Sequence, residues 1–76
     1  MDPQKSANAK KIGRDCYKSA VRRWGEKAWG YMSYQQRQEA VAYEATSAIM
    51  CWPTSDETTA PFIKEMIREA YGMVEP

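Results

Sequence analysis

The fold is decided by a stretch that spans residues 7–29 and reads ANAKKIGRDCYKSAVRRWGEKAW. Successive residues of an α-helix are rotated by about 100°, so residues three, four and seven apart share one face. Apolar residues recur at this spacing, and Ile12, Cys16 and Ala20 widen the face on one side. The pattern predicts a first helix over these residues, bent near Gly25. Its main apolar stripe contains Tyr17, Val21, Trp24, Ala28 and Tyr31.

A second face of this predicted helix is basic. Four cations follow one another at intervals of four residues, which places them in one row along the helix. Like charges at this spacing destabilise a helix by a few tenths of a kcal/mol per pair, so an anionic partner would compensate for the repulsion. Trp29 falls on the basic face and Trp24 on the apolar face, so we expect Trp24 to be buried and Trp29 exposed. The predicted partner-binding residues are Lys10, Lys11, Arg14, Lys18, Arg22 and Trp29.

Two further helices follow. Gly30 is a typical stop for the first, and Ser33 with Gln36 three positions later forms the capping-box pattern that begins the second. Pro53 ends the second helix. Its apolar stripe contains Val41, Ala45, Ala48, Ile49 and Trp52.

The third helix has the most regular apolar face of the three. Pro61 suits its first turn, and Gly72 suits its end. The face contains Phe62, Ile63, Met66, Ile67, Ala70 and Tyr71.

These elements predict an all-α protein that forms one domain over residues 1–76. The connection at Gly30–Ser33 is short, so we expect the first two helices to form an antiparallel hairpin, which the third completes as a small three-helix bundle. Residues 1–6 and 73–76 are expected to fray.

No stretch approaches the ~18 apolar residues of a membrane span, and residues 1–11 lack the apolar core of a signal peptide. We therefore expect a cytoplasmic protein without membrane contact.

The sequence offers little for catalysis. Histidine is absent, and the two cysteines, Cys16 and Cys51, lack the spacing of a metal site, so a four-ligand zinc site is excluded. Basic neighbours would lower the pKa of Cys16, but its place on the apolar face predicts a buried structural thiol. The two cysteines lie at one level of the predicted hairpin, so we expect a disulfide under oxidising conditions and free thiols in a reducing cytosol. We therefore predict a non-enzymatic protein without cofactors or metal.

Charge is distributed unevenly. Residues 1–27 contain eight basic and three acidic residues, whereas residues 28–76 contain three basic and seven acidic ones. Three interpretations of the basic face stay open: a solvated face balanced by the acidic third helix, a phosphate or nucleic-acid surface, and a surface for an acidic protein. Dedicated nucleic-acid binders of this size usually have a pI above about 9, whereas this chain is near 7.7.

We therefore expect a small, non-catalytic binding or regulatory protein that docks through its basic helix face on a larger protein or complex with an acidic surface. Sequence-independent binding of nucleic acid or phosphate through the same face is the alternative. The exposed Met and Tyr expected on so small a protein also suit a homodimer. In size, layout and lack of catalytic groups the chain is similar in general character to the small inhibitors and adaptors of phages and mobile elements.

Overall fold

The structure, a computed structural model, describes residues 2–51 and 60–74, without the side chain of Cys51. Four helices account for most of them: α1 (Pro3–Trp24), α2 (Glu26–Tyr31), α3 (Tyr34–Cys51) and α4 (Ala60–Gly72). The described residues contain no β-strand. The predicted all-α class is confirmed.

Helix α1 begins four residues earlier than the sequence pattern indicates. The carboxylate of Asp2 accepts a hydrogen bond of 3.0 Å from the backbone N–H of Gln4, and Pro3 occupies the first helical position. At the other end of the chain, Val74 is buried and its N–H donates to the carbonyl of Tyr71. Residues 3–6 are thus helical and Val74 is buried in the structure, while residues 1, 75 and 76 lie outside the described part. Fraying of residues 1–6 and 73–76 stays a prediction.

The predicted first helix is divided in two at Gly25. This residue has φ 87° and ψ 147°, a backbone conformation open to glycine and strained for other residues. Its N–H still donates to the carbonyl of Val21, and its own carbonyl accepts from the N–H of Trp29, so one helix ends and the next begins on the same residue. The bend expected near Gly25 is thus a complete break, and α2 does not continue the rotation of α1.

The start of α3 matches the sequence prediction. The hydroxyl of Ser33 accepts from the N–H of Gln36 at 3.1 Å, and the Gln36 side-chain oxygen accepts from the N–H of Ser33 at 2.8 Å. This reciprocal pair is the capping box. At α4, Pro61 lies in the first turn and Gly72 is the last helical residue, as predicted.

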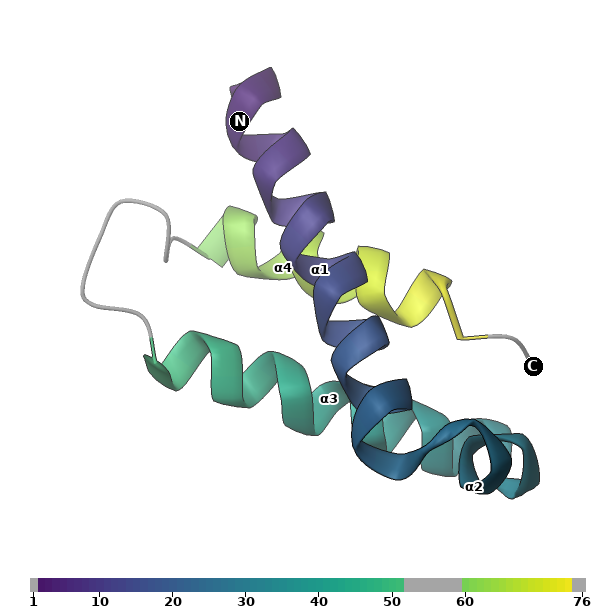
Figure 1. The fold of residues 1–76 in the computed structure, drawn as a ribbon. Helices are drawn as coiled ribbons and strands as arrows, with labels where there is room; N and C mark the ends of the chain where they lie inside the picture. The colour runs from purple at the N-terminus through teal and green to yellow at the C-terminus, as the bar shows by residue number, and fades with distance from the viewer. Residues whose placement is uncertain (1, 52–59, 75–76) are drawn as a thin grey trace.

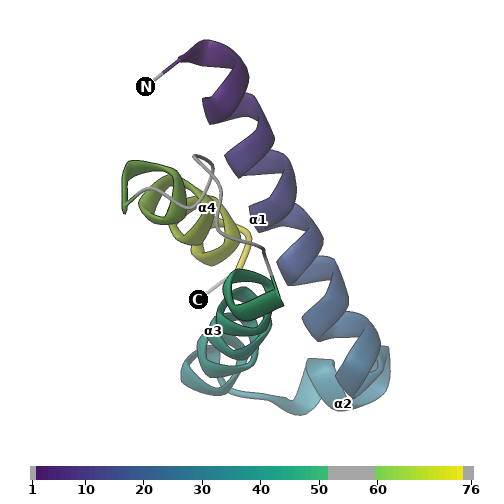
Figure 2. The ribbon, with the colours of Figure 1, turned by 90° about the vertical axis from the view of Figure 1, so that its left-hand side faces the viewer.

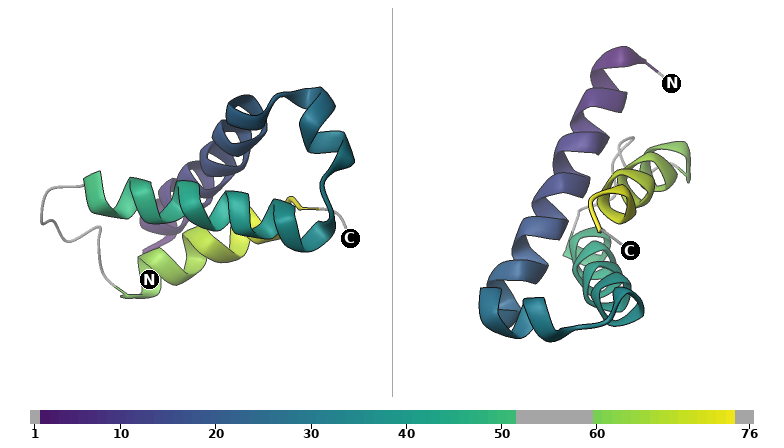
Figure 3. Two further views of the ribbon diagram at one scale, coloured as in Figure 1. Left: turned by 90° about the horizontal axis from the view of Figure 1, so that it is seen from below. Right: turned by 90° about the vertical axis from the view of Figure 1, so that its right-hand side faces the viewer.

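Helices α3 and α4 lie side by side and run in opposite directions, and α1 crosses both (Figures 1 and 2). Helix α2 links the end of α1 to the start of α3 at one end of the molecule (Figure 3). The antiparallel pair is therefore formed by α3 and α4, whereas the sequence suggested an antiparallel hairpin of the first two long helices. The reason is the break at Gly25: α2, most of which was assigned to the end of the first helix, carries the chain sideways before α3 begins.

Small residues allow α1 to lie close to α4. The buried residues of α1 recur at intervals of three and four, and none is larger than cysteine. A Cβ atom on Gly13 would lie 2.4 Å from the backbone oxygen of Met66, so glycine is required for the observed approach. The buried residues of α1 are Ala9, Gly13, Cys16 and Ala20.

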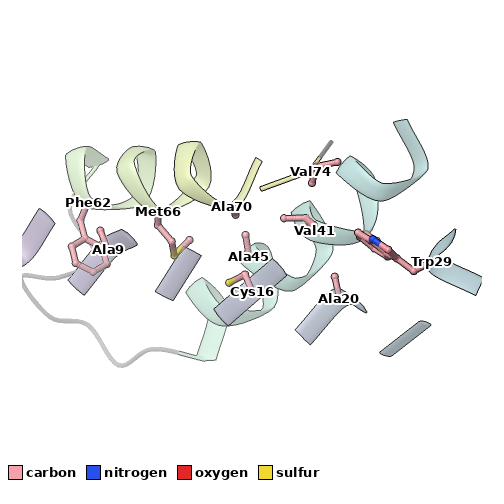
Figure 4. Close-up of a cluster of buried hydrophobic side chains, with 11 residues drawn as sticks. Ala9, Cys16, Ala20, Trp29, Val41, Ala45, Phe62, Met66, Ala70 and Val74 are labelled. Carbon is pink, nitrogen blue, oxygen red and sulfur yellow. The ribbon is translucent and has the colours of Figure 1, made fainter. Parts of the chain in front are cut away.

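The core runs as a row from Phe62 and Ala9 at one end to Trp29 at the other (Figure 4). The predicted apolar stripes of α3 and α4 supply much of it: Val41 and Ala45 are buried, as are three residues of α4. Trp52, assigned to the α3 stripe, and Pro53, assigned to its end, lie outside the described residues. The buried residues of α4 are Phe62, Met66 and Ala70.

The main stripe predicted for the first helix is not the centre of its buried face. Cys16 and Ala20, assigned to the margin, are buried, whereas Trp24 is 53% exposed and Tyr31 is 83% exposed. The buried face of α1 is thus shifted toward its small residues, because these permit close contact with α4. Beyond Gly25 the helical rotation on which the stripe depended no longer applies.

Candidate partner-binding surfaces

The predicted basic face divides into a paired part and an unpaired part. Lys10 lies 3.9 Å from the Glu65 carboxylate, and the Arg14 guanidinium donates to Glu69 at 3.2 Å. Glu65 also accepts a hydrogen bond of 2.8 Å from the hydroxyl of Ser6. The charges of Lys10 and Arg14 are therefore balanced by carboxylates of α4, as the first of the three interpretations of the basic face expects.

The remaining cations, Lys11, Lys18 and Arg22, are exposed and form no ion pair with any residue in 2–51 or 60–74. They are seven and four residues apart, so they share one side of α1. Lys18 and the buried Ala20 are two residues apart, which places them about 160° apart around the helix. We call these three residues the α1 cationic row. The row points away from the core, and one acid, Asp15, lies near it on the same helix.

Trp29 does not belong to the basic face. It is 8% exposed, and its ring meets that of Tyr17 edge-on, with centroids 5.7 Å apart. Arg37 lies over the Trp29 ring, with its guanidinium carbon 5.8 Å from the ring centroid, and its Nε donates a hydrogen bond to the Trp29 carbonyl. The prediction that Trp29 is exposed on the basic face is wrong, because the break at Gly25 turns α2 so that this side chain enters the core.

Trp24 lies at a groove in the surface. A hollow of about 450 Å³ separates the end of α1 from the first turns of α3. Trp24 forms part of one wall, and Tyr43, 59% exposed, forms part of the other. We call this hollow the aromatic groove; its lining residues are Arg23, Trp24, Met32, Gln36, Glu39, Ala40 and Tyr43.

Arg23 fixes one wall of the groove. It donates a hydrogen bond to the carboxylate of Glu44, which raises the pKa of the guanidinium further. Its guanidinium carbon also lies 5.2 Å from the centroid of the Tyr43 ring. These two contacts connect α1 to α3 across the groove and hold Tyr43 in place as a wall.

The residue pattern had not indicated this groove. The signal was present in the order Arg23-Trp24-Gly25: α1 ends at Trp24, so no residue of the same helix follows at the third or fourth position to flank its ring. The four residues that α3 contributes, Gln36, Glu39, Ala40 and Tyr43, recur at intervals of three and four and therefore share one face. That face was not distinguished because it is only partly apolar.

Cys16 is buried, as predicted for a structural thiol. Burial raises the pKa of the thiol, and the nearby carboxylates of Glu44 and Asp15 raise it further. The basic neighbours therefore do not produce a reactive thiolate. The proposed bridge to Cys51 lies outside the description, because the side chain of that residue is not described.

Within residues 2–51 and 60–74, no three Cys, Asp or Glu side chains come together as a set that could hold a metal ion.

Comparison with known proteins adds no relative: no protein-family model, curated protein or solved structure matches the chain. None of the described helices combines the length and the apolar character needed to cross a membrane.

Proposed function

We propose that the protein is a non-catalytic binding protein that docks on a larger protein through the α1 cationic row. The observation that carries the proposal is the contrast within one helix. Lys10 and Arg14 are paired with acids of α4, whereas Lys11, Lys18 and Arg22 face outward without an ion pair in the described chain. A row of one sign on a rigid helix is complementary to an acidic surface.

The geometry of the row suits carboxylates held on another structured element. Lys11 and Lys18 are separated by about 10 Å along the helix, and Lys18 and Arg22 by about 6 Å, given a rise of about 1.5 Å per residue. Arg22 supplies a planar donor group that pairs with a carboxylate through two hydrogen bonds. An acidic helix or loop cluster on a larger protein presents carboxylates at such intervals. Occupying that surface would make this protein an inhibitor or an adaptor.

Protein is favoured over nucleic acid by the charges around the row. Asp15 lies beside it on the same helix, and Glu65 and Glu69 of α4 flank the neighbouring Lys10 and Arg14. These carboxylates reduce the attraction for a continuous phosphate backbone, which is strongest for uninterrupted basic surfaces. The overall net charge of +1 acts in the same direction.

The proposal is tested with the double variant Lys18→Glu, Arg22→Glu. Tagged wild-type protein and the variant are incubated with extract of the source organism, and the retained proteins are identified by mass spectrometry. The retained partner is then purified, and its Kd is measured against both forms. We expect the variant to bind at least about tenfold more weakly, which corresponds to about 1.4 kcal/mol.

The matched control is Lys64→Glu, Arg68→Glu on α4. It reverses one lysine and one arginine at the same four-residue spacing on an exposed helix face, so the net charge changes equally. This control is expected to keep wild-type affinity. Equal weakening by both variants would show a general charge effect and contradict the proposal. Binding of arbitrary oligonucleotides at about 150 mM salt, lost in the α1 variant, would establish the nucleic-acid alternative instead.

A further inference from the structure

We propose that the aromatic groove is a self-association surface, in which two copies of the chain dock groove to groove and each places Trp24 in the hollow of the other. This inference concerns a different surface from the α1 cationic row and does not rest on the proposed function. It commits to a second copy of this chain as the occupant of the groove.

The groove contains both parts of a self-complementary contact. Its volume of about 450 Å³ is within the range of sites that enclose a large side chain or small ligand. Trp24 and Tyr43, which form its walls, are themselves exposed by more than half. Such a surface presents a projecting aromatic ring beside a hollow, and a two-fold axis brings the ring of each copy to the hollow of the other.

The residue types are those of a protein interface. Tryptophan, tyrosine, methionine and arginine are enriched in interface centres, and Trp24, Tyr43, Met32 and Arg23 supply one of each. The ring of Tyr43 lies under the Arg23 guanidinium, which restricts its orientation. Pre-organised side chains lose little conformational freedom on binding, which favours association.

The charges at the groove suit a second copy better than a partner of one sign. Glu39, on the α3 wall, is exposed and forms no ion pair within the described residues. Arg23, on the α1 wall, is paired with Glu44 through its Nε, but its side chain is more than half exposed and its terminal N–H groups can bind a second carboxylate. A two-fold contact brings the wall of one copy toward the opposite wall of the other, so that Glu39 of one copy approaches Arg23 of the second. The α1 cationic row has one sign and would repel its own copy, so it cannot serve this purpose.

The small size of the protein supplies the driving force. A chain of 76 residues encloses little core, and here large aromatic surface remains in water. Burial of this surface between two copies contributes stability that a single copy lacks.

A groove-to-groove dimer leaves the cationic row free. Arg22 and Trp24 are two residues apart, so their side chains leave α1 about 160° apart, nearly on opposite sides. Each dimer would therefore present two α1 cationic rows. If both rows bind one larger assembly, the second binding event becomes intramolecular and overall binding is strengthened.

The inference is tested by sedimentation equilibrium of the whole chain, from low micromolar to several hundred micromolar protein. We expect the wild type to rise with concentration from 8.7 kDa toward twice that mass. Trp24→Ala and, independently, Tyr43→Ala are expected to remain monomeric, with a dimer Kd raised at least about tenfold. The control is Tyr31→Ala, which removes a ring that is even more exposed but does not line the groove.

Circular dichroism confirms that each variant keeps its helices, and two groove variants guard against the failure of one to fold. Dimerisation of the wild type and of Tyr31→Ala, with loss in the folded groove variants, supports the proposal. A wild type that remains at 8.7 kDa at the highest concentration overturns it. So does a dimer that survives both Trp24→Ala and Tyr43→Ala.

Discussion

The middle of α1 and its C-terminal end pack against their neighbours with opposite kinds of side chain. Around Gly13 the helix presents small residues and comes so close to α4 that a single added carbon atom would meet the Met66 carbonyl. At its end the helix presents Arg23 and Trp24, and a groove remains between it and α3. The first region is closed, and the second is open.

This difference separates stability from binding within one helix. Where small residues line a helix, backbones approach closely and little surface is left for a partner. Where α1 breaks after Trp24, no later residue of the same helix flanks the ring, and it is 53% exposed. The paired charges lie where α1 faces another helix: Lys10 and Arg14 pair with α4, and Arg23 pairs with Glu44 of α3. The α1 cationic row, on the side of the helix that faces away from the core, has no such partner in the described residues.

The largest expected effect is on the free energy of unfolding, and it comes from removing the buried Trp29 ring rather than the half-exposed Trp24 ring. Trp29→Ala removes a buried ring, its edge-on contact with Tyr17 and the surface over which Arg37 lies. We expect this variant to lose about 3–5 kcal/mol of unfolding free energy. Trp24→Ala removes a ring that is half in water already, and we expect a loss below about 1 kcal/mol.

Urea unfolding followed by circular dichroism measures both values at a concentration low enough to keep the chain monomeric. The contrast between the buried Trp29 and the exposed Trp24 is contradicted if Trp24→Ala lowers the unfolding free energy more than Trp29→Ala does. That result would restore the single continuous helix that the sequence pattern suggests.

The elements of this fold were predictable where local chemistry determines them. The capping box of Ser33 and Gln36, the place of Pro61 and the buried stripe of α4 follow from residue types and spacing alone, and the structure confirms them. Each depends on contacts within a few residues, which the sequence lists directly.

The functional surfaces were less predictable because they depend on one torsion and on distant neighbours. A glycine within a helical pattern is compatible with a bend, a break or no effect on the helix. Only the positive φ at Gly25 shows that the helix breaks there, which leaves Trp24 exposed and buries Trp29, the reverse of the expectation. The pairing of Arg14 with Glu69 joins residues 55 positions apart. Spacing along the chain placed Lys10, Arg14 and Lys18 in one row, but the position of α4 decides which of them are paired.

The closed region can be tested with one methyl group. In Gly13→Ala the new Cβ meets backbone rather than a flexible side chain, so α1 and α4 must separate. We expect a loss of about 1–3 kcal/mol in unfolding free energy, even though alanine favours helix by about 1 kcal/mol over glycine. The matched control is Gly30→Ala in α2, where the added Cβ has no atom within 4 Å.

For the control, only the helix preference acts, so we expect no loss or a gain of up to about 1 kcal/mol. Thermal or urea unfolding of the two variants gives both signs in one experiment. A neutral Gly13→Ala would mean that the helices are not held at the described distance, and the contrast between the closed middle and the open end of α1 would disappear.

The smallest expected effect concerns the ion pairs beside the closed region. A double-mutant cycle of Arg14→Gln and Glu69→Gln should give a coupling of about 0.2–1 kcal/mol in unfolding free energy, because both groups are partly exposed and solvent screens them. The coupling should shrink as salt is added, since ions screen exposed charges. The control cycle, Lys18→Gln with Glu69→Gln, joins a cation of the open row to the same carboxylate and should be additive. Equal coupling in both cycles would mean that α4 neutralises the whole basic face, and the α1 cationic row would then have no free charge to offer an acidic partner.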